Sequence, residues 1–347
     1  MLKIPVDKIT SGMKLAKTLY RTVDGKILLM ENCRLKSAYI PKLKEYAIRY
    51  VYIQDPEEDK EEEFLQPIRE ETRTQSINIL KEINEQVKTN GTFNIEALNE
   101  VVISIIDYIL EDSRLVYNMI EIETHDSYTL SHSVNVCVLS ALIGTAMGLR
   151  RRELEILCIG AILHDIGKNV IDTKLLNKPG CLEPSEYNIF KEHARQGYEI
   201  IKRNVQISFL PAHTALQHHE REDGSGYPRG LTTKSIHQFS EIVAVADVYD
   251  AMTSNRAYKK AYPSHMAMQE LVNNSNTKYN YTVVEHFLKV VAPYPIGSVL
   301  LLSSGEKATV INVSRSKCIA MIKSGLDERK KYDLYKLNDI SIVGRLK

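Results

Sequence analysis

Residues 217–228 read Gln217-His218-His219-Glu220-Arg221-Glu222-Asp223-Gly224-Ser225-Gly226-Tyr227-Pro228. Adjacent side chains on a helix point about 100° apart, so His218 and His219 can serve one site only in a groove between them or where the helix ends. The following glycines supply such an end, because they permit positive φ and a close approach of backbone to ligand. The stretch predicts two imidazoles meeting at a helix end beside a flexible turn.

A second set of candidate ligands lies upstream in His164-Asp165-Ile166-Gly167-Lys168. An apolar stripe at helical spacing precedes this motif, so His164 and Asp165 are expected where helix meets loop, with side chains turned inward. A neutral imidazole with a carboxylate suits iron, manganese or zinc, and the carboxylate can bridge a metal pair. Lys168, four residues after His164, can present its ammonium to a phosphate oxygen.

Two further residues extend the candidate set. His132 precedes an apolar helix face, and Asp247 lies inside the apolar run 242–250. A carboxylate in such a run must be paired or metal-bound to be tolerated. Any one of these residues alone is more often structural or solvated, but together they favour a two-metal phosphodiesterase.

Composition limits the alternatives. The 347 residues suffice for two or three domains, and 45 basic against 44 acidic side chains give no overall field that would attract a nucleic acid polymer or an acidic membrane. The five cysteines include no C-x-x-C pair, which is typical of reduced thiols. Neither a signal sequence nor a membrane span is indicated, so a soluble cytoplasmic protein is expected.

Changes in pattern predict a mainly α protein with small flanking modules. Residues 1–60 indicate an α+β module, with Asp24-Gly25 as a hairpin signal, and residues 61–115 an acidic linker and leading helices. Helical periodicity continues through 116–290, which is expected to be an all-helical catalytic domain. Residues 291–347 show short strand patterns that predict a small β-rich appendage.

Ordered motifs across residues 110–290 resemble the HD-GYP domain. They are Asp126-Ser127-Tyr128-Thr129-Leu130-Ser131-His132-Ser133-Val134, Leu163-His164-Asp165-Ile166-Gly167-Lys168, Lys178-Pro179-Gly180, Glu192-His193-Ala194-Arg195-Gln196-Gly197, His218-His219-Glu220-Arg221, Asp223-Gly224-Ser225-Gly226-Tyr227-Pro228 and Ala246-Asp247-Val248-Tyr249-Asp250-Ala251-Met252-Thr253-Ser254-Asn255-Arg256. The HD-GYP family is a branch of the HD superfamily of metal-dependent phosphohydrolases. Its characterised members hydrolyse the bacterial second messenger cyclic di-GMP. The first 54 residues resemble, more faintly, the small module that often precedes this domain.

The resemblance implies a role for each matching residue. It implies a metal site built from His132, His164, Asp165, His193, His218, His219 and Asp247, with Asp165 bridging two ions. It also implies that Lys168 contacts the scissile phosphate, that Tyr227 shapes the substrate cavity, and that Arg256 and Lys259 hold the other phosphate. Some family members recruit a third metal through a glutamate at the position of Tyr128, so two metals are expected here.

The expected chemistry is hydrolysis of cyclic di-GMP to pGpG in bacterial signalling, where a second cut would give GMP. Two divalent ions, iron or alternatively manganese, would lower the pKa of a bridging water, and the resulting hydroxide would attack phosphorus. Asp165 and Lys168 are the expected catalytic residues. Other expected partners are a second copy of the chain or a signalling protein.

Three alternatives stay open at this point. The substrate could be a mixed cyclic GMP-AMP dinucleotide, since the implied contacts recognise phosphates rather than bases. The domain could be a catalytically weak cyclic-dinucleotide sensor, although every ligand position has the expected residue type. A di-iron oxygenase is the third, because relatives in the wider HD superfamily oxidise small molecules, but the glycine-rich turn and Arg256 favour a phosphate ligand.

Overall fold

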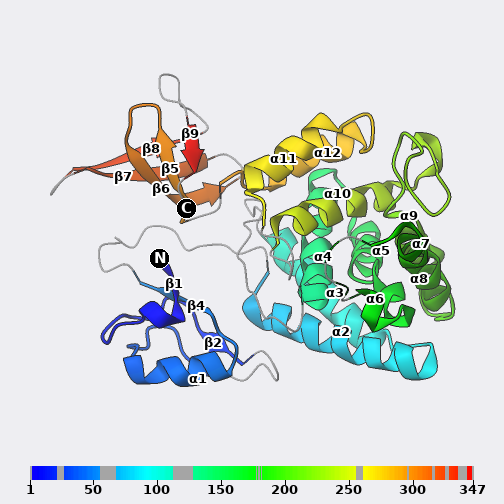
Figure 1. Ribbon diagram of the computed structural model, residues 1–347, viewed down its shortest axis with the longest axis horizontal. Coiled ribbons are helices and arrows are strands. Elements are labelled where there is room, and N and C mark those ends of the chain that lie inside the picture. Colours follow the sequence, from blue (N-terminus) through cyan, green and yellow to red (C-terminus); the bar gives the residue numbers. More distant parts are fainter. Residues whose placement is uncertain are drawn as a thin grey trace. The chain divides into compact units, whose positions relative to one another are not determined.

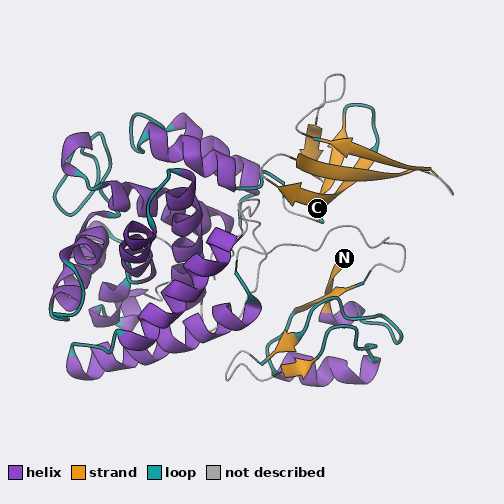
Figure 2. Cartoon of the chain, turned by 180° about the vertical axis from the view of Figure 1, so that it is seen from behind, coloured by secondary structure: helices purple, strands orange, loops and turns teal. Residues whose placement is uncertain are grey.

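The protein is described from a computed structural model. The structure describes residues 2–21, 27–54, 68–111, 128–176, 178, 180, 182–254, 261–294, 297–314, 317–324, 328–334 and 342–345. Helices from α2 to α12 form one compact unit, and the strands belong to the terminal parts of the chain (Figures 1 and 2). The mainly α fold predicted from the sequence is therefore confirmed.

The N-terminal module is a small α+β structure. Its elements are β1 (Leu2–Pro5), η1 (Val6–Lys8), β2 (Leu19–Tyr20), β3 (Ile27–Leu29), η2 (Ser37–Tyr39), α1 (Ile40–Glu45) and β4 (Tyr50–Ile53). Strand β1 pairs antiparallel with β4, and β2 pairs antiparallel with β3. The predicted Asp24-Gly25 turn lies outside the described residues. A core that includes Leu15, Leu35 and Val51 holds these elements together.

The helical unit contains α2 (Glu70–Asn90), α3 (Glu96–Glu111), α4 (Tyr128–Ala146), α5 (Arg151–Ile162), η3 (Ile166–Val170), α6 (Thr173–Leu176), α7 (Pro184–Lys191), α8 (His193–Lys202), α9 (Phe209–Gln217), η4 (Thr233–Ser235), α10 (Gln238–Thr253), α11 (Ser264–Asn273) and α12 (Tyr281–Val290). The predicted stripe of α5 is buried from Leu154 to Ile162. This stripe directs the end of α5, and with it the motif that follows, toward the core.

Helices α4 and α10 lie in the middle of the helical unit. Both are apolar on most of their faces, and buried residues of α10 include Asp247 and Asp250. By length and composition alone, Thr129–Ala146 of α4 could also cross a membrane, but 67% of that segment is buried inside the unit. A helix that is apolar all round is expected at the centre of a helical core.

Gly167 permits the closest packing near the site. A Cβ at this position would lie 2.0 Å from the carbonyl oxygen of His193 and 2.5 Å from the amide nitrogen of Gly197. Both clashes are with backbone atoms, which cannot rotate away. The absence of a side chain at Gly167 therefore lets η3 contact α8 and brings the His164-Asp165 motif next to His193.

The C-terminal part is an antiparallel five-stranded sheet. Its strands are β5 (Val299–Leu302), β6 (Lys307–Ser314), β7 (Lys317–Ser324), β8 (Glu328–Asp333) and β9 (Ile342–Arg345), in the order β8-β7-β6-β5-β9. Alternate residues of β5, including Leu300 and Leu302, are buried in its core. The predicted β appendage is confirmed, whereas the domain limits near 60 and 115 fall outside the described residues and stay predictions.

We expect Gly167→Ala to destabilise the protein by about 1–3 kcal/mol, because the added methyl group must push η3 away from the backbone of α8. Gly197→Ala is the matched control at the same crossing, since its Cβ would meet only ordinary contacts at 3.4 Å or more. In a helix that change should be neutral or stabilising by up to about 1 kcal/mol. Urea unfolding measures both, and equal stability of the two variants would contradict the packing role of Gly167.

Candidate metal centre

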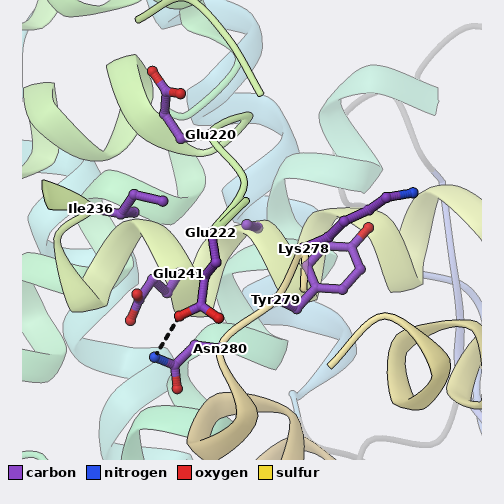
Figure 3. Close-up of a pocket in the computed structure, with 8 residues that line it drawn as sticks. Glu220, Glu222, Ile236, Glu241, Lys278, Tyr279 and Asn280 are labelled. Atoms are coloured by element: carbon purple, nitrogen blue, oxygen red, sulfur yellow. Dashed lines mark hydrogen bonds between the residues drawn. The ribbon is translucent and has the colours of Figure 1, made fainter. Parts of the chain in front are cut away.

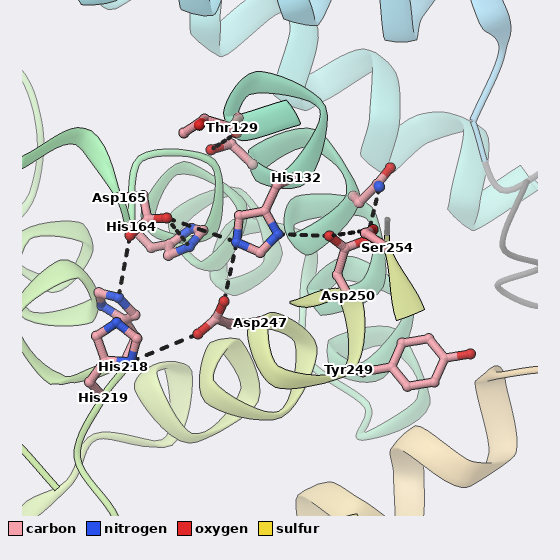
Figure 4. Close-up of polar contacts among 12 residues, drawn as sticks. Thr129, His132, His164, Asp165, His218, His219, Asp247, Tyr249, Asp250 and Ser254 are labelled. Atoms are coloured by element: carbon pink, nitrogen blue, oxygen red, sulfur yellow. Dashed lines mark hydrogen bonds and ion pairs between the residues drawn. The ribbon is translucent and has the colours of Figure 1, made fainter. Parts of the chain in front are cut away.

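Side chains from separate elements meet inside the helical unit. They are His132 of α4, His164 and Asp165 between α5 and η3, His193 at the start of α8, His218 and His219 at the end of α9, and Asp247 of α10. All are buried except His219, which is nearly so. The structure thus brings together all seven residues that the sequence motifs indicate as ligands. Figure 4 labels these residues apart from His193.

The carboxylate of Asp165 lies between two pairs of imidazoles. Its Oδ2 is 3.3 Å from Nε2 of His164 and 3.8 Å from Nε2 of His132. Its Oδ1 is 3.5 Å from Nε2 of His193 and 3.8 Å from Nε2 of His218. Each oxygen therefore faces a different pair of nitrogens, which is the arrangement that a carboxylate bridging two ions requires.

The donor atoms divide into two groups, within each of which all lie within 4.8 Å of one another: Asp165, His193, His218 and His219, and His132, His164 and Asp247. Asp247 also spans the groups, because Oδ1 is 3.1 Å from Nε2 of His132 and Oδ2 is 3.9 Å from Nδ1 of His219. Two adjoining sets of nitrogen and oxygen donors can hold metal ions.

Three of the imidazoles are oriented by the helix end that precedes them. Nδ1 of His164 donates to the carbonyl of Ala161, Nδ1 of His193 to Phe190, and Nδ1 of His218 to Ala215, at 2.7–2.8 Å. Each carbonyl is in the last turn of a helix, where carbonyls lack an intrahelical partner. The bonds place the proton on Nδ1 and leave the Nε2 lone pair facing the site.

The inward-facing atoms fit a metal. Among the described residues, Nε2 of His164, His193, His218 and His219 and Oδ1 of Asp165 are buried without a hydrogen-bond partner. Buried polar atoms that lack a partner cost free energy unless something else satisfies them. Nitrogen and carboxylate donors of this kind are typical ligands for first-row transition metals.

Electrostatics keep most ligands in the state that metal binding needs. Burial lowers the pKa of His193 to about 4 and that of His218 and His219 well below the usual value, so these rings are neutral. Burial alone would raise the pKa of Asp165, but the ammonium of Lys168 and nearby imidazoles hold it well below its usual range. Metal ligands must be deprotonated, and these are.

His132 differs, because two carboxylates face its ring. Burial would lower the pKa of His132, but hydrogen bonds to Asp247 and Asp250 raise it to about 9. Without a metal, the ring therefore holds a proton on Nε2 at neutral pH. A cation bound between His132 and Asp247 would take the place of this proton.

The glycine-rich turn folds back onto His219. A Cβ at Gly226 would lie within 2.5 Å of the carbonyl oxygen of His219, and the amide of Tyr227 donates to that same oxygen at 3.2 Å. The carboxylate of Glu220 closes the turn by accepting the amides of Arg229 and Leu231 at 2.8 and 2.9 Å. The turn thereby places the Tyr227 ring 4.6 Å from that of His219.

The residues predicted to contact substrate are placed in part. Nζ of Lys168 pairs with Oδ2 of Asp165, and 24% of the Lys168 side chain is exposed, so its ammonium lies at the edge of the cluster. Burial raises the pKa of Tyr227, which keeps its phenol protonated. Arg256 and Lys259 lie outside the described residues, and their contact with a phosphate stays a prediction.

A chain of hydrogen bonds behind His132 was not indicated by the sequence. Nδ1 of His132 donates to Oδ2 of Asp250 at 2.7 Å (Figure 4). Nδ2 of Asn135 donates to Oδ1 of the same carboxylate at 2.8 Å. Arg73 of α2 in turn donates to Oδ1 of Asn135 at 2.6 Å. These contacts fix the ring of His132 with Nε2 toward Asp247. Asp250 stands three residues after Asp247 within the motif 246–256, and this position was the signal that the sequence offered.

A pocket apart from the cluster is lined by Glu220, Glu222, Ile236, Glu241, Ala244, Lys278, Tyr279 and Asn280 (Figure 3). Nδ2 of Asn280 donates to Oε1 of Glu222 at 3.2 Å. Burial raises the pKa of Glu241 to about 7, with a further contribution from the charge of Glu222. Glu241 therefore carries a proton in the folded protein at a pH where an unfolded glutamate is ionised.

Comparison with known families identifies the region that carries the cluster. The profile of the HD domain matches residues 114–283. This region of the chain is an HD domain. The match contains all seven clustered residues and the Gly226-Tyr227-Pro228 turn, but it leaves α2, with Arg73, outside. The match confirms the HD domain that the motifs indicate.

The chain is also similar to curated bacterial proteins. The chain is 44% identical over 176 residues to a cyclic di-GMP phosphodiesterase of Thermotoga maritima, covering 50% of this chain and 48% of that protein. It is 33% identical over 224 residues to a cyclic di-GMP phosphodiesterase of Pseudomonas aeruginosa, covering 64% of this chain and 54% of that protein. The chain thus spans about half the length of these relatives.

Similarity to a solved structure covers more of the chain than the HD domain. A solved structure of an HDG"Y"P protein from Bdellovibrio bacteriovorus superposes with a TM-score of 0.54 at 19% identity, covering 82% of this chain and 97% of that one. At this identity the similarity shows a shared fold.

We expect Asp250→Asn to weaken metal binding about 10- to 100-fold, the usual effect of losing the partner that orients a ligand histidine. The neutral amide cannot accept from His132 as strongly as the carboxylate does. Titration of the metal-free protein with Mn²⁺ measures the change. Asp107→Asn removes an exposed carboxylate that pairs with Arg151 and is the control. Equal affinities for Mn²⁺ in the two variants would contradict a role of Asp250 in metal binding.

We expect Glu241 to make folding pH-dependent. The pKa of Glu241 is raised from 4.5 in the unfolded chain to about 7 in the folded protein. Its contribution to the free energy of unfolding is therefore fully present below pH 4.5 and is lost as the pH rises through about 7. Partial exposure limits this loss to about 1 kcal/mol. Urea unfolding at acidic and mildly basic pH should show a smaller loss in Glu241→Gln than in wild type or in Glu100→Gln, an exposed glutamate of α3. An identical loss in all three proteins would refute the assignment.

Proposed function

We propose that this protein is a metal-dependent phosphodiesterase that hydrolyses cyclic di-GMP. The observation that carries the proposal is the placement of one buried carboxylate, Asp165, between two groups of inward-facing imidazole nitrogens. The Thermotoga and Pseudomonas relatives are named as cyclic di-GMP phosphodiesterases. Fold and donor set therefore support the same chemistry.

The proposed ligands are His132, His164 and Asp247 for one divalent ion and His193, His218 and His219 for the other, with Asp165 shared. Imidazole and carboxylate donors suit iron and manganese. When bound, such a metal pair supplies a deprotonated water at neutral pH and neutralises charge on the phosphoryl oxygens. Two ions rather than three are proposed because Tyr128 stands where a further carboxylate ligand would be needed.

The chain's own residues would hold and polarise the substrate. The ammonium of Lys168 lies at the edge of the cluster, where it can stabilise negative charge that develops on a non-bridging phosphate oxygen. The protonated phenol of Tyr227 borders the same region beside His219. Arg256 and Lys259 are proposed to hold the second phosphate of a cyclic dinucleotide.

A mixed cyclic GMP-AMP dinucleotide is the second candidate substrate. A Vibrio cholerae relative that is 29% identical over 212 residues, covering 60% of this chain and 41% of that protein, is named as a 3'3'-cGAMP-specific phosphodiesterase. Lys168, Arg256 and Lys259 are proposed to contact phosphates, which both dinucleotides contain. A catalytically weak sensor is less well supported, because every proposed ligand position has the expected residue type. A cytoplasmic location and a homodimer or signalling partner stay predictions from the sequence.

The test is hydrolysis by the full chain, purified without oxygen and loaded with Fe²⁺ or Mn²⁺. We expect cyclic di-GMP to be converted to pGpG, and chromatography would show whether GMP follows. Cyclic GMP-AMP is offered separately. Asp165→Ala should lose bound metal and activity together. A fully metal-loaded wild-type protein that cleaves neither dinucleotide would contradict the proposal.

Lys168→Ala separates metal binding from phosphate stabilisation in the same assay. We expect metal content to be retained and turnover to fall about 10²–10³-fold, the usual effect of losing one transition-state contact. Lys174→Ala, which removes an exposed lysine of nearby α6, should leave turnover unchanged. Equal turnover in the two variants at saturating substrate would remove Lys168 from the reaction.

A further inference from the structure

Helix α7 is attached to the metal cluster through Phe190 and His193. The carbonyl of Phe190 accepts Nδ1 of His193 at 2.7 Å, and the two rings lie 5.1 Å apart. At the other end of the helix, Lys178 pairs with Glu186 at 2.6 Å. Side chains on α7 therefore have defined positions relative to the cluster.

Tyr187 lies one turn before Phe190 on this helix. Its ring is parallel to that of Phe190, with centroids 6.5 Å apart and planes 10° apart, and it meets Tyr227 edge-on at 6.3 Å. Tyr227 in turn lies 4.6 Å from the ring of His219. Aromatic rings thus extend outward from the cluster, and Tyr187 at the outer end is 43% exposed.

A positive charge accompanies the two tyrosines. Nζ of Lys191 lies 4.6 Å from the centroid of the Tyr187 ring and 5.6 Å from that of Tyr227. Among the described residues, no carboxylate forms a salt bridge with Lys191. An ammonium over aromatic rings is held there by cation–π attraction and is still able to attract an anion.

We propose that Tyr187 and Lys191 form a subsite for a purine base of the cyclic dinucleotide, with Tyr187 stacking on the base and Lys191 attracting the adjacent phosphate. This inference rests on the proposed function and extends it from phosphate to base. Exposed aromatic side chains bind unpaired bases by stacking, because every base has a π face. A base attached to a phosphate at the cluster would project outward, along the direction in which Tyr227 and Tyr187 extend.

Kinetics of the full, metal-loaded chain test the subsite with cyclic di-GMP. We expect Tyr187→Leu to raise KM about tenfold, as expected for loss of one base-stacking contact, while kcat stays within about twofold. Tyr187→Phe keeps the ring and should behave as wild type. Tyr281→Leu, which removes another exposed tyrosine from α12, is the control and should change neither constant.

A spectroscopic measurement separates stacking from a structural effect. A cyclic dinucleotide carrying one fluorescent purine analogue should be quenched on binding to wild type and to Tyr187→Phe, and less quenched by Tyr187→Leu at saturation. Quenching and KM that do not differ between Tyr187→Leu and Tyr281→Leu would overturn the subsite while leaving hydrolysis intact. An equal rise in KM for Tyr187→Phe and Tyr187→Leu would also overturn it, since the hydroxyl rather than the ring would then be needed. Failure of wild type to cleave any cyclic dinucleotide would instead overturn the proposed function.

Discussion

The carboxylate of Asp165, buried between two pairs of imidazoles, is the interaction on which the rest of the site depends. An ionised carboxylate in a protein core is costly unless positive charge compensates it. Lys168 provides one such charge at the edge of the cluster, and metal ions held by the donor atoms would provide more. The helical unit must therefore hold donor atoms from separate elements close together. Burial of apolar side chains does not by itself favour this arrangement.

Helix ends orient three of the imidazoles in the cluster. His164, His193 and His218 each lie three residues after a carbonyl in the last turn of a helix, and each donates Nδ1–H to that carbonyl. One bond thus satisfies a terminal carbonyl, selects the tautomer and orients Nε2. Gly167 and Gly226 then let backbone segments approach more closely than any side chain would permit.

The contacts behind the ligands extend the site beyond the HD domain. Asp250 and Asn135 connect His132 to Arg73 on α2, and Asn169 of η3 donates to Asn84 of the same helix at 2.7 Å. Helix α2 thus supports both the ring of His132 and the segment that follows Lys168. Orientation of a ligand histidine by a carboxylate commonly affects metal affinity. A helix outside the matched region thus contributes to the candidate centre.

Much of the fold and the set of candidate ligands could be predicted from the sequence because these features are local. Apolar spacing indicated α5 and the helical core, alternation indicated the C-terminal strands, and the charged or glycine-rich motifs placed candidate ligands at helix ends. Reasoning from single residues could not find Asp250, Asn135 or Glu220, since a polar residue on a helix or in a loop has many ordinary roles. Only the tertiary structure decided that the two oxygens of Asp165 face different pairs of imidazoles, that Arg73 reaches the same network, and that Tyr187 stands beside Tyr227. Sequence spacing determines which face of an element a side chain occupies, whereas the packing of helices distant in the chain determines which side chains meet.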